Sequence, residues 1–203
     1  MSTITLTNGR KVGDYLNPYI IAELNTSHFG DFDTAKKMIA EAKIAGCDCV
    51  KFQSWTDNTL YSHSYYKANK IAHRVVKKFS ISSDQLKELS LFASSIGIDF
   101  SSTPYSIEEA TFLVDNCNVP FVKIASMELN NLFYLTDLAK LKVPLVLSTG
   151  MGTTQEIQTA VKLLESYSSQ FSILHCTSIY PTEPQYIRLL NITGLRELCP
   201  EIG

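Results

Sequence analysis

Six apolar, strand-like segments of this chain each end in a short polar group, and a segment with helical spacing follows each one. The polar groups are Glu23, Lys51 with Gln53, Ser102-Thr103, Lys123 with Ser126, Ser148-Thr149 and His175-Cys176-Thr177. Repeated strand-then-helix units build parallel sheets, and such sheets gather their functional residues at the carboxyl ends of the strands. The repeat therefore predicts an α/β fold with the polar groups at one rim.

The predicted elements cover most of the chain. Strands are expected at residues 19–22, 49–52, 98–101, 119–124, 144–147 and 171–174, and helices at 32–45, 83–96, from 106 onward, 132–141 and 154–167. Residues 4–13 alternate around Asn8-Gly9, which predicts a β-hairpin ahead of the first unit.

The spacing of the units predicts how they are arranged. After the third unit the strands recur about every 25 residues, the usual length of one unit in a (β/α)8 barrel. We therefore expect a single TIM-barrel-type domain over residues 1–203 that holds about six of the eight units. Because six strands cannot close a barrel, we also expect an amino-terminal part of a longer protein, with a seventh strand about to begin at residues 199–203.

Residues 54–82 interrupt this repeat. The segment is polar, rich in tyrosine and much longer than an ordinary connection. Long insertions after a strand tend to be lids or binding loops, which is our expectation here. The basic run from Lys67 to Lys78 is expected to be a solvated face or a loop.

The composition excludes several classes of protein. With 203 residues, 45% of them hydrophobic, and a net charge of -2, the chain can bury a core and gives no reason to expect nucleic acid as a partner. No apolar stretch is long enough for a membrane span, and the first residues do not resemble a signal peptide. Five cysteines, an odd number, fit reduced thiols better than a disulfide framework. We expect a cytoplasmic protein.

Two lysines lie inside apolar strand sequence, Lys51 in CVKFQ and Lys123 in FVKIA. Lysine is almost never fully buried without a partner. Each is therefore expected to point into the mouth of the barrel and to supply a fixed positive charge for a phosphate or a carboxylate. We expect the two ammonium groups to converge on one dianion; an edge-strand position without function is the alternative for either.

The remaining polar residues have two interpretations each. Glu23 is either a general acid or base, or a hydroxyl-holding group, or it is a salt-bridged or capping carboxylate. The hydroxyls at the strand ends, Gly150, and the helix start at Thr153-Thr154 are typical of ordinary turns and caps, but together with the lysines they suit a phosphate cradle. His28 and His175 are expected to be structural and His63 and His73 to lie on the surface, and no pair of the histidines has zinc-site spacing within one element.

At these residues the chain resembles the sialic acid synthases, also called nonulosonic acid synthases. The matching segments are IAE with HxG (21–30), VKFQ (50–53), FSSTPY (100–105), VKIASxE (122–128), LSTGM (147–151) and LHCTSxYPT (174–182). They occur in the order and spacing of that family across nearly the whole chain.

The resemblance implies a (β/α)8-barrel enzyme that condenses phosphoenolpyruvate with an open-chain N-acylmannosamine-type sugar. The products are a nine-carbon 2-keto acid and phosphate. In such enzymes manganese or magnesium polarises the sugar aldehyde for attack by carbon 3 of the enol, water adds to carbon 2, and phosphate leaves by C–O cleavage. The resemblance also implies a homodimer for the full-length protein.

The matching positions imply roles for individual residues. Catalytic candidates are Glu23, Lys51 and Lys123. The implied phosphoenolpyruvate-holding set is Lys51, Thr103, Lys123, Ser126 and Ser148. Gln53, Tyr105, Ser178 and Tyr180 are implied to line the sugar and the rest of the site, and Glu128 is a further substrate-binding candidate.

Two features depart from the family pattern. Ser27 precedes His28 where the family usually has asparagine, which puts the local hydrogen bonding in doubt. The family's metal-binding histidines lie in a Ser-Asp-His-Thr segment and beyond it, past residue 203, as does an antifreeze-like domain that completes the neighbouring subunit's site. We therefore expect no metal ligands within these 203 residues and little or no turnover by them alone.

Two other functions stay open. One is a Schiff-base aldolase or lyase in which Lys123 or Lys51 attacks a keto acid. The other is a non-catalytic piece that dimerises or aggregates through exposed sheet edges. The sugar is open as well, among N-acetylmannosamine, a 6-deoxy-diacetamido hexose and a phosphorylated mannosamine.

Overall fold

A computed structural model describes residues 3–199 of the chain. The chain divides into two compact units, one formed by residues 19–120 and the other by residues 121–203 together with residues 1–18. We call them the 19–120 unit and the 121–203 unit and describe each by itself.

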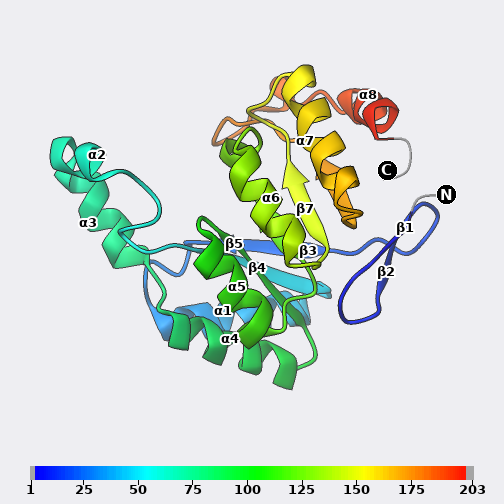
Figure 1. The fold of residues 1–203 in the computed structure, drawn as a ribbon. Helices are drawn as coiled ribbons and strands as arrows, with labels where there is room; N and C mark the ends of the chain where they lie inside the picture. The colour runs from blue at the N-terminus through cyan, green and yellow to red at the C-terminus, as the bar shows by residue number, and fades with distance from the viewer. Residues whose placement is uncertain (1–2, 200–203) are drawn as a thin grey trace. The chain divides into compact units, whose positions relative to one another are not determined.

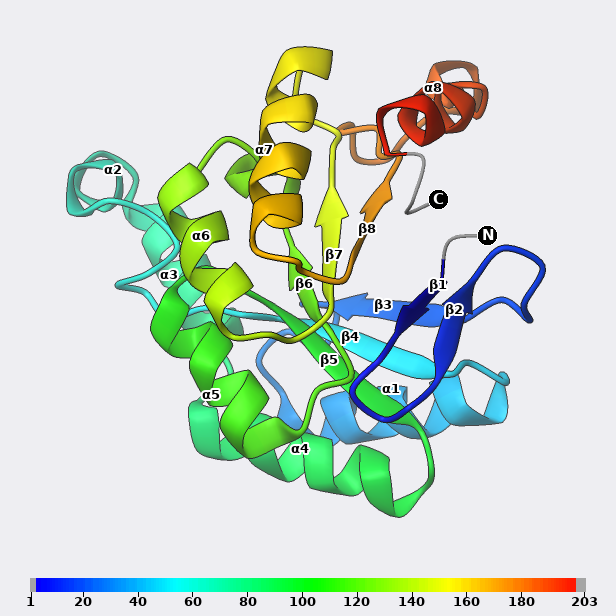
Figure 2. The ribbon, with the colours of Figure 1, turned by 45° about the vertical axis from the view of Figure 1, so that its right-hand side comes forward.

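The 19–120 unit is a three-stranded parallel sheet with helices on one face. Strands β3 (Ile21–Asn25), β4 (Cys49–Ser54) and β5 (Asp99–Pro104) pair in that order. Helices α1 (Phe32–Ile44), α4 (Ser83–Ser95) and α5 (Ile107–Cys117) cover one face of the sheet (Figures 1 and 2). The rings of Phe52 and Phe100 stack on adjacent strands, with centroids 5.6 Å apart.

Side-chain caps mark the first residues of the helices in this unit. Asp31 accepts a hydrogen bond from the backbone of Thr34 at 2.7 Å, and Ser82 forms a capping box with Gln85. Such caps satisfy backbone N–H groups that have no partner within the helix. Apolar positions at helical spacing, such as Ile39 and Leu89, are fully buried, so the predicted helices at 32–45 and 83–96 are confirmed.

Residues 54–82 are more ordered than their polar composition suggests. They contain two short helices, α2 (His63–Ala68) and α3 (Lys70–Phe79), which the sequence analysis did not predict. The two helices accompany a small cluster of the buried side chains Trp55, Tyr66 and Val76. In α3 the apolar residues Ile71, Val75, Val76 and Phe79 do have helical spacing, but the polar, tyrosine-rich composition of the whole segment favoured a loop.

The 121–203 unit repeats the same pattern. Strands β6 (Val122–Ile124), β7 (Leu145–Ser148) and β8 (Phe171–Leu174) form a parallel sheet in that order. A 3-10 turn, η1 (Ser126–Glu128), follows β6, and helices α6 (Leu132–Lys140) and α7 (Thr154–Ser166) follow β6 and β7 (Figure 2). After β8 come η2 (Pro184–Tyr186) and α8 (Asn191–Leu198), neither of which was predicted.

The predicted amino-terminal hairpin is confirmed. Strand β1 (Thr3–Thr5) pairs antiparallel with β2 (Lys11–Gly13), with Ile4 opposite Val12. The backbone N–H of Thr5 donates to the side chain of Gln170 at 2.7 Å. This hydrogen bond attaches the hairpin to Gln170, the residue just before the start of β8.

Six parallel strands, each followed by a helix, therefore confirm the predicted units, but several strands end later than predicted. Strands β3, β4 and β5 continue through Glu23, Gln53 and Thr103. Polar side chains do not end these strands because the backbone ladder continues whichever face a side chain points to. The expected seventh strand falls on residues 200–203, outside the described part of the chain.

Two further observations concern the whole described chain. The five cysteines are free thiols, and Cys49, Cys117 and Cys199 are buried. Within residues 3–199, each helix is too short or too polar to span a lipid bilayer.

Candidate active site

The helix-free face of the β3-β4-β5 sheet carries the first group of predicted residues. Glu23 on β3 is the direct register partner of Lys51 on β4, and Gln53 is the partner of Thr103 on β5. Because side chains alternate between faces, Lys51, Gln53 and Thr103 point to the same side. The strands thus align the residues that the sequence placed in three separate units.

Lys51 is buried, with 5% of its surface exposed, and it has two polar partners. Its ammonium group forms an ion pair with a carboxylate oxygen of Glu23 and donates to the hydroxyl of Thr103 at 3.1 Å. An unpaired buried ammonium would be strongly destabilising, so these partners explain how the lysine is tolerated here.

Glu23 is held at the edge of this group, with about half of its side chain exposed. Its second oxygen accepts a hydrogen bond from the backbone of Asn25 at 3.1 Å, and the strand register shifts between these two residues. Bulges of this kind often redirect a side chain beside an active site. Both interpretations of Glu23 fit the structure. The carboxylate is salt-bridged to Lys51, and because about half of it is exposed, a ligand could also reach it.

The second group lies in the 121–203 unit and is centred on Lys123. This lysine is 8% exposed and donates to the hydroxyl of Ser148 at 2.5 Å and to the backbone carbonyl of Ile124 at 2.6 Å. The thiol of Cys176 donates to the same Ser148 oxygen at 3.2 Å. A fixed positive charge, a hydroxyl and a thiol therefore meet at the carboxyl ends of β6, β7 and β8.

Backbone and hydroxyl contacts join the loops around Lys123. The hydroxyl of Ser126 accepts from the backbone of Gly150 at 3.1 Å, and Thr149 donates its hydroxyl to the carbonyl of Leu174 at 2.8 Å. A Cβ atom at Gly150 would lie 2.6 Å from the hydroxyl of Ser178 and 3.0 Å from the carbonyl of Cys176. Glycine is needed here because the loops after β7 and β8 approach each other closely.

The helix start at Thr153 differs from the expectation of open anion-binding donors. Thr153 and Glu156 form a capping box in which the carboxylate accepts from the backbone of Thr153 at 2.8 Å. The backbone of Glu156 in turn donates to the Thr153 hydroxyl. The protein's own side chains thus satisfy two of the donors that the sequence analysis assigned to a phosphate cradle.

The remaining sugar-side candidates are less closely grouped. Glu128 lies in η1, where its carboxylate accepts from the side chain of Asn131, the cap of α6, at 2.8 Å. Tyr105 directly follows β5 and packs against Trp55. Ser178 and Tyr180 lie in the stretch after β8 and are exposed, Tyr180 at 92%. Their roles stay predictions.

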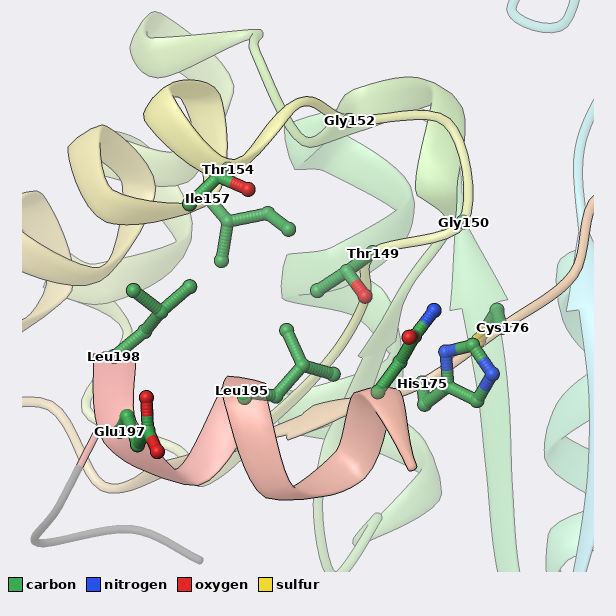
Figure 3. A pocket seen from close by; sticks show the side chains of 12 residues that line it. Thr149, Gly150, Gly152, Thr154, Ile157, His175, Cys176, Leu195, Glu197 and Leu198 are labelled. Atoms are coloured by element: carbon green, nitrogen blue, oxygen red, sulfur yellow. The ribbon is translucent and has the colours of Figure 1, made fainter. Parts of the chain in front are cut away.

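A pocket of about 540 Å³ opens beside this second group (Figure 3). Its walls come from the loop after β7, the start of α7, the end of β8 and helix α8. The residues that line it are Thr149, Gly150, Gly152, Thr154, Ile157, His175, Cys176, Asn191, Gly194, Leu195, Glu197 and Leu198. Because α8 was not predicted, the sequence analysis missed this wall of the pocket.

Two further groups have shifted pKa values because they are buried. His28 is 1% exposed beside the ring of Phe52, and its Nδ1 accepts from the backbone of Gly30 at 3.0 Å, so burial lowers the pKa of this imidazole. Burial raises the pKa of Glu109 above its usual range, although Thr59 and Tyr105 donate to the carboxylate. Glu109 was not among the predicted site residues; the one signal that the sequence offered was its position four residues after Tyr105, in the first turn of a helix.

Two other histidines, His63 and His73, were expected at the surface. His63 is exposed, and 44% of the His73 side chain is exposed although it pairs with Asp57 at 3.3 Å and stacks on the ring of Tyr66. Among residues 3–199, no group of three or more histidine, cysteine, aspartate or glutamate side chains is arranged to hold a metal ion. Lys51 and Lys123 lie in different units, and their convergence on one ligand stays a prediction.

Comparisons with known proteins agree with the segments that carry the resemblance. Residues 38–201 match the model of the NeuB family. The chain is 37% identical to an N-acetylneuraminate-9-phosphate synthase of Drosophila melanogaster over 196 residues, which is 91% of this chain and 52% of that protein. It is 34% identical to an N,N'-diacetyllegionaminic acid synthase of Legionella pneumophila, over 93% of this chain and 56% of that protein.

A solved structure is similar as well. The fold matches an N-acetylneuraminic acid synthetase from Leptospira borgpetersenii, crystallised with citrate, at a TM-score of 0.88 and 31% identity. The match covers 97% of this chain and 66% of that one. The chain spans about half the length of the curated relatives it matches.

Proposed function

Because this chain belongs to the NeuB family, we propose that it supplies the phosphoenolpyruvate-binding part of a nonulosonic acid synthase. The proposed reaction condenses phosphoenolpyruvate with an N-acylmannosamine-type sugar and releases phosphate by C–O cleavage. The observation that carries the proposal is the pair of buried lysines, Lys51 within β4 and Lys123 within β6, each with a hydroxyl partner on the neighbouring strand.

The charges of these residues suit a phosphorylated carboxylic acid. Phosphoenolpyruvate carries several negative charges, and buried ammonium groups stabilise such a ligand more than exposed ones because water screens them less. Thr103 and Ser148, which accept from the lysines, can rotate their hydroxyl hydrogens toward a phosphate or carboxylate oxygen. Holding the enol in a fixed position also lowers the entropic cost of its attack on the sugar aldehyde.

The sugar is proposed to meet the other predicted residues. Glu23 would act beside the reacting carbons, and its contact with Lys51 would place a carboxylate next to the bound enol. Gln53, Tyr105, Glu128, Ser178 and Tyr180 are proposed to contact the sugar. The relatives' names cover sialic and legionaminic acids, so we propose an amino sugar without choosing among the candidates.

The rest of the proposal concerns the complete protein. We propose a TIM-barrel-type domain, a cytoplasmic homodimer, and a requirement for manganese or magnesium. The described residues do not fit the metal, since they offer no suitable ligand cluster, so its ligands are proposed to lie beyond residue 203.

The proposal is tested by assaying the complete reading frame that contains this chain. Phosphoenolpyruvate labelled with oxygen-18 at the bridging position is incubated with N-acetylmannosamine, its 6-phosphate or a diacetamido hexose, with and without manganese. We expect a keto acid to form with one of these sugars, together with phosphate that retains the label. Unlabelled phosphate, or no dependence on any sugar, would contradict the proposal.

The two rival functions are distinguished by separate measurements. In the structure both lysine nitrogens act as hydrogen-bond donors, while a Schiff base needs a neutral amine with a free lone pair. Covalent trapping of a keto acid by borohydride would favour the aldolase or lyase. Light scattering that shows concentration-dependent association, without binding of phosphoenolpyruvate, would favour a non-catalytic piece.

A further inference from the structure

The insertion at residues 54–82 is a folded element with its own small core. Trp55, Tyr66 and Val76 are buried in it, and Leu60, Phe79 and Tyr105 pack around them. The indole of Trp55 donates to the carbonyl of Val76 at 3.3 Å. The beginning and the end of the insertion are thereby joined, so it can be held to the rest of the 19–120 unit as one piece.

Glu109, in the first turn of α5, holds this piece at its beginning. One carboxylate oxygen accepts from the hydroxyl of Thr59 at 2.6 Å, and the other accepts from the backbone of Tyr105 at 2.8 Å. The Thr59 oxygen also accepts from the backbone of Thr56 at 2.8 Å. Bonds to an ionised carboxylate are about twice as strong as neutral ones, so one side chain firmly joins the insertion to the residue after β5.

Tyr105 connects this arrangement to the candidate active site. Its ring meets that of Trp55 edge-on, with centroids 5.9 Å apart and an interplanar angle of 67°. Two residues earlier in the chain, Thr103 accepts from Lys51. The carboxylate of Glu109 therefore fixes both the insertion and the segment that leaves the lysine site.

We propose that Glu109 is a positioning residue that seats the 54–82 insertion over Tyr105 and thereby sets the affinity for the sugar. The inference rests on the proposed function, in which Tyr105 contacts the sugar and the lysines hold phosphoenolpyruvate. Glu109 does not touch a substrate; it acts through Tyr105 and the insertion. Removing the Glu109 carboxylate should therefore change KM for the sugar more than KM for phosphoenolpyruvate.

The test compares Glu109→Ala with Glu108→Ala in the complete protein. Glu108 is exposed and lies one residue earlier in the same helical turn, so the control removes the same charge from the same helix end. We expect Glu109→Ala to raise KM for the sugar at least about tenfold, because it removes both charge-assisted hydrogen bonds that hold Thr59 and Tyr105, while KM for phosphoenolpyruvate stays unchanged. The Glu108 variant should match the wild type.

Thr59 gives an independent test that leaves the helix untouched. Thr59→Val keeps the shape but removes the hydroxyl, whereas Thr59→Ser keeps the hydroxyl. We expect the valine variant to reproduce the sugar-specific rise in KM and the serine variant to restore the wild-type value. In the 203-residue chain, amides of residues 56–82 should exchange hydrogen faster in Thr59→Val than in Thr59→Ser.

The possible failures can be told apart. A wild-type protein without synthase activity contradicts the proposed function. An active wild type in which Glu109→Ala and Thr59→Val raise both KM values equally, or neither, overturns the role of Glu109. If Glu109→Ala does not fold, the Thr59 pair decides, and equal exchange in its two members also overturns the inference.

Discussion

Lys51 and Lys123 are the same residue type in two similar parallel sheets, yet their positions and surroundings differ, because β4 is the middle strand of its sheet and β6 is the first strand of its own. Lys51 contacts a carboxylate, Glu23, and the hydroxyl of Thr103. Lys123 donates to the hydroxyl of Ser148, which a thiol also approaches, and to a backbone carbonyl. A lysine that pairs with a half-exposed carboxylate can exchange that partner for a ligand, whereas the Lys123 ammonium is fixed by its own strand and the next.

The largest expected effect comes from removing either lysine. Lys51→Met and Lys123→Met should each weaken phosphoenolpyruvate binding at least about a hundredfold, because a charge-assisted contact to the dianion is lost from a buried position. Isothermal titration calorimetry of the complete protein measures this. Urea unfolding provides the control, since replacing a buried charge with an apolar side chain often leaves stability unchanged or raised.

This pair of variants also sharpens the comparison. If both lysines bind one dianion, the two variants should lose similar affinity for phosphoenolpyruvate. Loss in only one variant would assign the anion to one unit and leave the other lysine with a structural role.

The two units can also be compared by the loss of stability that alanine causes at one glycine in each, Gly30 and Gly150. A Cβ at Gly30 would lie 2.0 Å from the backbone carbonyl of Lys78, and its φ of +81° suits only glycine well. At Gly150 the nearest atom, at 2.6 Å, is a serine hydroxyl that can rotate away. We expect Gly30→Ala to lower the free energy of unfolding by about 2–3 kcal/mol, and Gly150→Ala by less.

Denaturant unfolding of both variants measures the difference. Hydrogen exchange provides the control, because the loss in Gly30→Ala should be concentrated in residues 54–82, where the carbonyl of Lys78 lies. Equal destabilisation by the two alanines would show that the backbone contact at Gly30 relaxes more easily than its geometry indicates.

A smaller effect is expected at the carboxylate that distinguishes the two lysines. Glu23→Gln removes the negative charge beside Lys51, so phosphoenolpyruvate should bind roughly two- to fivefold more tightly, the range expected for a partly exposed pair. Turnover should fall if Glu23 acts on the reacting centre. Calorimetry and steady-state kinetics separate the two effects; weaker binding would mean that Glu23 positions Lys51 rather than competing for it.

The smallest effect concerns pH. Because burial raises the pKa of Glu109 above its usual value near 4.5, the folded chain holds this proton more tightly than the unfolded chain does. Stability should therefore fall as pH rises from about 4.5 through the raised pKa of Glu109. Thermal unfolding from pH 4 to 7 should show a stability that falls more, or rises less, with pH in the wild type than in Glu109→Gln; an identical slope in the two proteins would contradict the raised pKa.

Much of the fold could be predicted from local sequence. The stripe that includes Ala35 and Ile39, and the capping pattern at Ser82, indicate their helices because the side chains that decide them lie within one or two turns. Of the two helices in the 54–82 insertion, α2 (His63–Ala68) is too short to show a helical period, whereas α3 could have been predicted from the spacing of its apolar residues.

The candidate site was predictable in its residue types and not in its contacts. Lys51 and Lys123 stood out because burying a charged side chain within an apolar strand is energetically unfavourable unless the charge has a partner or a ligand. Their partners Thr103 and Ser148 were on the list of candidates, but nothing local showed which hydroxyl would meet which lysine.

By itself, then, the sequence determined the succession of the parallel strands and of the helices predicted after them, together with the two charged positions that a ligand would need. Only the tertiary structure decided that Glu23 faces Lys51 and that Glu109 binds Thr59. Periodicity is set by neighbours in the chain, whereas these contacts join residues that are distant in the sequence, and their pairing depends on strand register and on how the insertion packs, which local sequence does not encode.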